Sequence, residues 1–238
     1  MPSLKSLTHR LLSLVAPRTC LVCGCALTRA EQYLCLACML DMPRTGVHRH
    51  DGNRLTERLS RRTALARVAA WFTYSHRDPY SRIVRMAKYN DMPRLACWAG
   101  RTFAAELAAD GFFDSDAIDL IVPTPLSRWR LMSRGYNQTM KIAQGIAQTT
   151  GIAVCSDAVV AHRHISQTTL DRRQRAANVL DGVFTVHRPD LIDGRNVLVV
   201  DDVITTGATI DALVSAITTQ AAPASVSVLT LGMTAAVR

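Results

Sequence analysis

The stretch VLVVDDVITTGATI at positions 197–210 places two acidic residues beside a threonine-rich turn. Asp201 and Asp202 follow four apolar residues, so we expect a buried strand that ends at Val200. The turn at 205–209 precedes a helical pattern, and a helix N-terminus rich in hydroxyl groups can hold a phosphate. Two carboxylates would repel a bare polyphosphate, but they can accept hydrogen bonds from sugar hydroxyls or hold a divalent cation. The stretch therefore predicts a ribose 5-phosphate site; the alternative is a strand-to-helix turn capped by Asp and Thr.

Five of the seven cysteines lie in the segment CLVCGCALTRAEQYLCLAC at positions 20–38. Cys20 and Cys23 form one Cys-x-x-Cys pair, and Cys35 and Cys38 form another. Four thiolates with this spacing favour a closed, structural tetrahedral Zn²⁺ site over a set of disulfides, because no secretion signal precedes them. Cys25 could replace Cys23 as a ligand or lie beside the metal.

The remainder of the chain alternates strand and helix patterns. Strands are expected at 117–123, within 152–161, at 182–186, at 196–200 and at 225–231, and helices at 92–111, 136–151 and 208–220. In the first helix, the apolar residues Leu95, Trp98, Phe103 and Leu107 are expected to face the core. Such alternation predicts an α/β fold with a mostly parallel open sheet covered by helices. We expect two domains, an N-terminal helix with a zinc ribbon at 1–50 and an α/β domain at 51–238.

The basic segment 43–72 is expected to be an irregular linker, with His48 and His50 on a solvated face rather than in the metal site. The first 16 residues carry leucines at helical spacing, which predicts an amphipathic helix docked on the protein; a membrane-surface helix is the alternative. No apolar run is long enough to span a membrane. We expect a cytoplasmic protein, with peripheral attachment to the inner membrane face left open.

Composition limits the partners. The formal net charge is +9, which favours nucleic acid, polyphosphate or another anionic partner without choosing among them. Aromatic residues make up only 5% of the chain, so no stacking platform for bases is evident.

The stretch VLVVDDVITTGAT resembles the phosphoribosyl pyrophosphate (PRPP) binding motif of type I phosphoribosyltransferases. The chain as a whole resembles the ComF family of competence proteins, in which a zinc ribbon precedes a phosphoribosyltransferase-like domain. Three further stretches carry the resemblance: AKYNDMP at 87–93, DLIVPTPLSRWRLMSRGYNQ at 119–138 and RHISQTTLDRRQRAANVLDGVF at 163–184.

The resemblance implies roles for particular residues. Asp201 and Asp202 would hold the ribose, and the 5-phosphate would bind Thr205, Thr206, Gly207, Ala208 and Thr209. Pyrophosphate, with Mg²⁺, would be met by Arg128, Arg163, Lys88 and Arg134. Purine salvage members of the superfamily carry an acidic general base where this chain has Thr205, so transfer to a 6-oxopurine is not expected.

Two functions follow from these observations. The first is a phosphoribosyltransferase-like protein that binds PRPP with Mg²⁺ and acts in DNA uptake during natural transformation, with an unidentified acceptor if it is an enzyme. The second is a non-enzymatic protein that handles single-stranded DNA and uses the PRPP site as a nucleotide or metabolite sensor. The basic residues Arg58, Arg61 and Arg62 would contact the strand, and DNA-uptake or recombination proteins would be partners.

Overall fold

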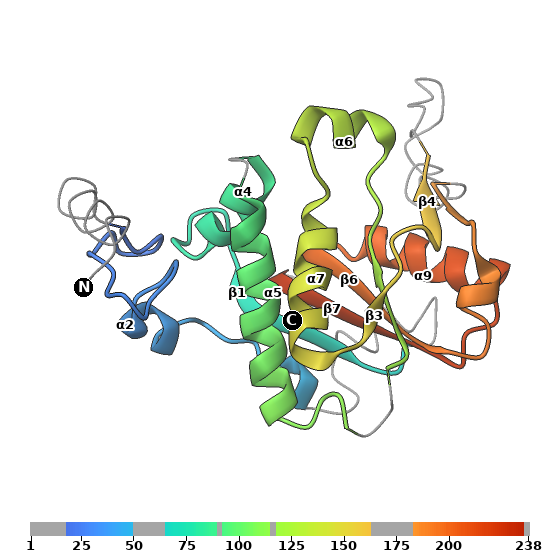
Figure 1. Cartoon of the computed structure of the whole chain (residues 1–238), viewed down its shortest axis with the longest axis horizontal. Coiled ribbons are helices and arrows are strands. Elements are labelled where there is room, and N and C mark those ends of the chain that lie inside the picture. Colours follow the sequence, from blue (N-terminus) through green and yellow to red (C-terminus); the bar gives the residue numbers. More distant parts are fainter. Residues whose placement is uncertain (1–17, 50–64, 90–91, 115–117, 163–182, 236–238) are drawn as a thin grey trace, which may run out of the picture.

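The computed structural model describes residues 18–49, 65–89, 92–114, 118–162 and 183–235. Five parallel strands form one sheet in the order β1-β7-β6-β2-β3 (Figure 1). Their bounds are β1 Val68–Tyr74, β2 Leu120–Pro123, β3 Ala153–Val154, β6 Asn196–Ile204 and β7 Ser225–Thr234. A separate antiparallel pair joins β4 (Val159–Ala161) to β5 (Phe184–Val186).

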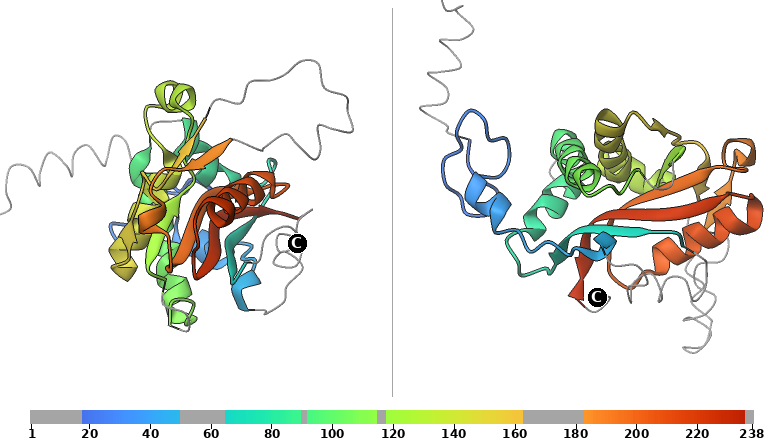
Figure 2. Two further views of the ribbon diagram at one scale, coloured as in Figure 1. Left: turned by 90° about the vertical axis from the view of Figure 1, so that its right-hand side faces the viewer. Right: turned by 90° about the horizontal axis from the view of Figure 1, so that it is seen from below.

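Helices cover both faces of the sheet (Figure 2). The long helices are α4 Ser81–Tyr89, α5 Pro93–Ala109, α7 Gln138–Thr150 and α9 Ala208–Gln220. The short ones are α2 Leu36–Leu40, α6 Arg128–Arg134 and the 3-10 turns η1 Val47–Arg49 and η2 Pro189–Leu191. Because side chains alternate along a strand, Leu198 and Val200 of β6 pack with α5 and α7 while Val197 and Val199 pack with α9. Both faces of the central strand are thus buried.

Helices α5 and α7 approach very closely, and two glycines permit the contact. A Cβ atom at Gly100 would lie 2.2 Å from the carbonyl oxygen of Ile142. A Cβ atom at Gly145 would lie 2.0 Å from the carbonyl oxygen of Cys97. The two backbones therefore touch where larger residues would force them apart.

The predicted fold class, a mostly parallel open sheet with a small N-terminal module, is confirmed. The helix expected to end at Gly151 does so, and this glycine has a φ of 76° that favours it over other residues. Expectations about two strands were wrong. Strand β6 does not end at Val200, because its last residue Ile204 still pairs with Met233 of β7. The end of the expected irregular linker, 68–72, lies in β1, which is buried against β7.

Several expectations lie outside the described residues: the N-terminal helix, His50, the arginines at 58–62, and Arg163. The domain boundary between residues 50 and 51 falls there too and stays a prediction. Within the described ranges, no helix combines the length and the apolarity needed to cross a bilayer.

Candidate functional site

A cavity of about 630 Å³ lies at the carboxyl ends of the parallel strands. Its walls come from residues at or after the ends of β1, β2 and β6 and from the β4–β5 pair. Open parallel sheets bind their ligands at this edge, because the loops there converge while the strand ends hold them in place. The cavity contains both Asp201 and Asp202, and it is the natural centre of the candidate site.

The two aspartates are buried inside β6, with 8% and 6% of their surfaces exposed. Asp202 has both oxygens engaged: Lys88 Nζ lies 2.9 Å from Oδ1, and Gln138 Nε2 donates to Oδ2 at 2.7 Å. Asp201 Oδ1 accepts a hydrogen bond of 2.8 Å from the backbone N–H of Asp202. Asp202 is therefore held as a fixed anion between a cation and an amide, whereas Asp201 has no cation of its own among the described residues.

This difference shows in the protonation of Asp201. Burial raises the pKa of Asp201 to about 7, and the negative charge of Asp202 adds to the rise. The backbone N–H of Asp202 and the ammonium group of Lys88 act in the opposite direction. A cation or a hydroxyl donor that entered the cavity would stabilise the ionised form and lower this pKa.

The segment Arg-Gly-Tyr-Asn-Gln at 134–138 ties three elements together. Gly135 ends α6 with a φ of 75°, and the hydroxyl of Tyr136 donates to the carbonyl oxygen of Ala87, beside Lys88 in α4. Asn137 caps α7 by accepting from the backbone N–H of Thr139 and donates to the carbonyl oxygen of Thr124 after β2. The first residue of α7, Gln138, then reaches Asp202. The segment therefore positions both partners of Asp202.

The threonine-rich turn lies beside the carboxylates. Gly207 has a φ of 85° and is the N-cap of α9, which begins at Ala208 as expected. Thr205 and Thr209 line the cavity, while the hydroxyl of Thr206 accepts from the backbone N–H of Ala208 at 3.4 Å. The first turn of a helix leaves backbone N–H groups without partners inside the helix. The turn can therefore offer hydroxyl and amide donors to an anion.

The predicted pyrophosphate-binding cations are distributed unequally. Lys88 and Arg134 line the cavity, and Arg134 Nη1 also donates to Gln138 Oε1 at 3.1 Å. Arg128 is exposed at the start of α6 and is not among the lining residues, whereas Arg130 is. The loop expected after β2 is partly helical, and residues two apart, such as Arg128 and Arg130, lie on nearly opposite sides of a helix. A period-3.6 reading of 128–134 would have drawn attention to Arg130 and Arg134 together.

Further cavity groups were not singled out from the sequence. The hydroxyl of Thr124 is buried and has no hydrogen-bond partner within the described residues, although it lies in the cavity wall. The imidazoles of His76 and His162 also line the cavity. Gln138 lies at the end of the stretch 119–138 that carries the family resemblance, but nothing in the sequence indicated that it would contact Asp202. An unpartnered buried hydroxyl is costly, so Thr124 marks a position where a bound polar group would gain a hydrogen bond.

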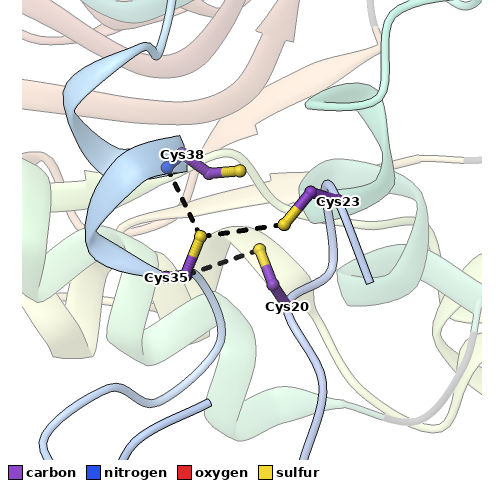
Figure 3. A group of neighbouring side chains, drawn as sticks. All are labelled: Cys20, Cys23, Cys35 and Cys38. Atoms are coloured by element: carbon purple, nitrogen blue, oxygen red, sulfur yellow. Dashed lines mark hydrogen bonds between the residues drawn. The ribbon is translucent and has the colours of Figure 1, made fainter. Parts of the chain in front are cut away.

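The four cysteines predicted as metal ligands form a second centre (Figure 3). Their sulfur atoms all lie within 4.8 Å of one another, and Cys23 Sγ is 3.7 Å from Cys35 Sγ. Tetrahedral Zn–S bonds of about 2.3 Å place neighbouring sulfurs about 3.8 Å apart, so the cluster fits such an ion. All seven cysteines are free in the structure, which therefore shows none of the alternative disulfides.

The backbone around the cluster supports the same conclusion. Gly24 has a φ of 77°, and its N–H donates to the carbonyl oxygen of Cys20, which closes a tight turn around the first pair. The backbone N–H of Cys35 points to Cys20 Sγ at 3.4 Å, and that of Cys38 points to Cys35 Sγ at 3.5 Å. Such contacts stabilise thiolates. Cys25 is exposed and its thiol lies beside those of Cys23 and Cys35, but it is not one of the four grouped ligands, which could hold a metal ion without it.

The chain was compared with known proteins. No protein-family model matches the chain. The DNA utilization protein YhgH of Escherichia coli (strain K12) is 31% identical over 193 residues, which cover 80% of each chain. Competence protein F of Haemophilus influenzae is 27% identical over 140 residues, which are 56% of this chain and 59% of the relative. Among solved structures, glutamine PRPP amidotransferase from B. subtilis, complexed with ADP and GMP, matches 62% of this chain and 30% of its own, with 18% identity and a TM-score of 0.41.

Proposed function

Because the chain belongs to the ComF family of competence and DNA utilization proteins, we propose that it binds PRPP with Mg²⁺ in the cavity at Asp201 and Asp202 and acts in DNA uptake. The observation that carries the proposal is the pairing of two buried carboxylates with a threonine-rich helix start in one cavity. This pairing suits a ligand that bears both hydroxyl groups and a phosphate. The cavity is also lined by the cations Lys88, Arg130 and Arg134, which would meet the pyrophosphate.

Each part of the ligand has a matching group. The ribose 2- and 3-hydroxyls would donate to Asp201 and Asp202, and the 5-phosphate would accept from the turn at 205–209. Asp201 has the less engaged carboxylate and is the residue that would meet Mg²⁺, which on binding would neutralise charge on the pyrophosphate.

The cysteine cluster is proposed to hold a structural Zn²⁺, because four thiolates leave no ligand position open for water. Free thiols throughout the chain are typical of a reducing compartment, which supports a cytoplasmic location.

Whether the bound PRPP reacts is a separate matter. Thr205 stands where a carboxylate base would be needed for a 6-oxopurine, which favours the second candidate, a sensor that binds PRPP without transfer. The first candidate, a transferase, requires an acceptor whose own proton is easily lost or is taken by His76 or His162, which line the cavity. Pyrophosphate release that depends on an added acceptor would favour the transferase.

Calorimetric titration of the zinc-loaded protein with PRPP and Mg²⁺ tests the binding itself. The parent should bind, and the double variant Asp201→Asn, Asp202→Asn should not. Asp190→Asn is the control, because this exposed aspartate lies in η2, before the first residue of β6. Absence of binding by the folded parent, or equal binding by the double variant, would exclude the proposed site.

A further inference from the structure

A second concave surface lies between the cysteine-rich module and α5, away from the cavity described above. It encloses about 460 Å³, and we call it the module groove. Its walls include three arginines, two aromatic residues and one amide: Arg18, Arg94, Arg101, Tyr33, Trp98 and Gln32. None of these residues lines the cavity at Asp201.

One face of α5 supplies half of the groove. Arg94, Trp98 and Arg101 are spaced by four and three residues, which places them on the same side of the helix. At 1.5 Å per residue, the two arginines are about 10 Å apart along the axis. Trp98 was expected to face the core, but it is only partly buried and contributes to the groove wall.

The other half comes from the module. Arg18 lies two residues before Cys20, and Tyr33 lies two residues before Cys35, so the cysteine cluster fixes the chain beside both. The backbone N–H of Leu21 donates to the carbonyl oxygen of Tyr33 at 3.0 Å and links the two segments. The groove exists only while the module is folded against α5.

None of the three groove arginines forms an ion pair with a carboxylate among the described residues, although the Glu31 carboxylate accepts from the backbone N–H of nearby Thr28. Arg18 Nη2 donates to the carbonyl oxygen of Thr28 at 2.9 Å, and Arg101 Nη2 donates to Gln32 Oε1 at 3.2 Å. Both acceptors are neutral, and they orient the guanidinium groups without removing their charge. Arg94 and Arg101 also lie close enough to Tyr33 to oppose the rise that burial causes in its pKa. An anion that entered the groove would meet three cations at once.

The aromatic rings lie between these cations. The ring centroids of Tyr33 and Trp98 are 5.3 Å apart, and Trp98 in turn lies 6.1 Å from the buried ring of Trp71. This chain of rings anchors Trp98 in the core while part of it stays accessible. Sites that bind single-stranded nucleic acid combine two kinds of group. Cations contact the phosphates, and fixed aromatic rings stack with the unpaired bases.

We propose that the module groove binds single-stranded nucleic acid, with phosphates at Arg18, Arg94 and Arg101 and a base against Tyr33 and Trp98. A duplex keeps its bases stacked on each other and cannot use the rings. An acidic peptide would use the arginines alone. The proposal does not depend on PRPP binding, because the groove and the cavity share no residue.

Fluorescence anisotropy of a labelled oligothymidylate of about 20 nucleotides, titrated with the full-length, zinc-loaded chain, tests the proposal. The variant Arg94→Glu, Arg101→Glu should lose at least about tenfold in affinity for the oligonucleotide. The variant Arg94→Gln, Arg101→Gln loses two phosphate contacts, so the steepness of log K against log salt concentration should fall by about 1.4. Tyr33→Leu should lose about fivefold through stacking. The matched control is Arg85→Glu, Arg195→Glu, which reverses two charges at positions outside the groove and should stay within about twofold of the parent.

The outcomes separate the possible ligands and the two proposals. Equal losses in the groove and control variants would show attraction to overall charge and overturn the proposal. Equal competition by a duplex or by polyglutamate would overturn it as well, in favour of a duplex or an acidic peptide. The groove variants should still bind PRPP as the parent does, and the Asp201→Asn, Asp202→Asn variant should still bind the oligonucleotide. The unfolding temperature of each variant, compared with that of the parent, identifies any variant that fails to fold. If the Arg94→Glu, Arg101→Glu variant fails to fold, the change in salt slope of the milder Arg94→Gln, Arg101→Gln variant tests the proposal in its place.

Discussion

Replacing Asp201 by Asn should stabilise the ligand-free protein, and the gain should grow with pH. The pKa of this carboxyl rises from an ordinary 3.8 to about 7 because burial and Asp202 disfavour the charge. The folded state therefore keeps a proton that the unfolded state releases between pH 4 and 7. The cost of the buried charge is absent below about pH 4, increases through this window and is complete above about pH 7. At 1.36 kcal/mol per pKa unit, the full cost is about 4 kcal/mol.

Asn has nearly the same shape, and its oxygen can still accept the N–H of Asp202, so the variant removes mainly the charge. Its stability advantage over the parent should be about 2.5 kcal/mol larger at pH 8 than at pH 5. For a chain of this length, that corresponds to a relative gain of about 5 to 10 °C in melting temperature. Thermal unfolding of both zinc-loaded proteins at the two pH values, without added Mg²⁺, measures it. A difference in melting temperature that stays constant between pH 5 and pH 8 would refute the reasoning.

Three further perturbations follow from the structure. Metal analysis should find one Zn²⁺ per chain. The Cys23→Ser variant should lose this zinc, and the Cys25→Ser variant should keep it. The reverse result would identify Cys25 as the ligand in place of Cys23. Lys88→Met should lower the free energy of unfolding by about 3 kcal/mol, because it leaves the Asp202 carboxylate buried without its cation. Urea unfolding measures this loss, and added Mg²⁺ should restore part of it. Gly100→Ala and Gly145→Ala should each cost more than about 3 kcal/mol, because their methyl groups would overlap backbone carbonyls; an unchanged urea midpoint would contradict the close α5–α7 contact.

The sequence predicted the features that are local along the chain. The spacing of Cys20, Cys23, Cys35 and Cys38 is enough to predict a cluster, because each pair needs only one turn to converge. The start of α9 after Gly207 is equally local.

Features created by distant contacts were missed. Gln138 reaches Asp202 across 64 residues, and nothing in its own neighbourhood marks it as a site residue. Strand β1 was hidden by the arginine-rich stretch before it. Trp98 has the helical spacing of a core residue, and only the packing of the module against α5 leaves its ring partly open. A low aromatic content therefore did not exclude a stacking surface, since two well-placed rings suffice.

The module and the α/β part share one interior. Cys20, Cys35 and Cys38 belong to the same apolar cluster as Trp71 and Phe103. Across the junction, the hydroxyl of Tyr80 donates to the carbonyl oxygen of Cys38, and Arg44 binds both carboxylate oxygens of Glu106. Truncating the chain before β1 would open this interior to water. Oxidation of the thiols should therefore destabilise the whole chain, not the cysteine-rich module alone, and make it prone to aggregation and degradation. The abundance of the protein in the cell would then follow the redox state and the zinc supply.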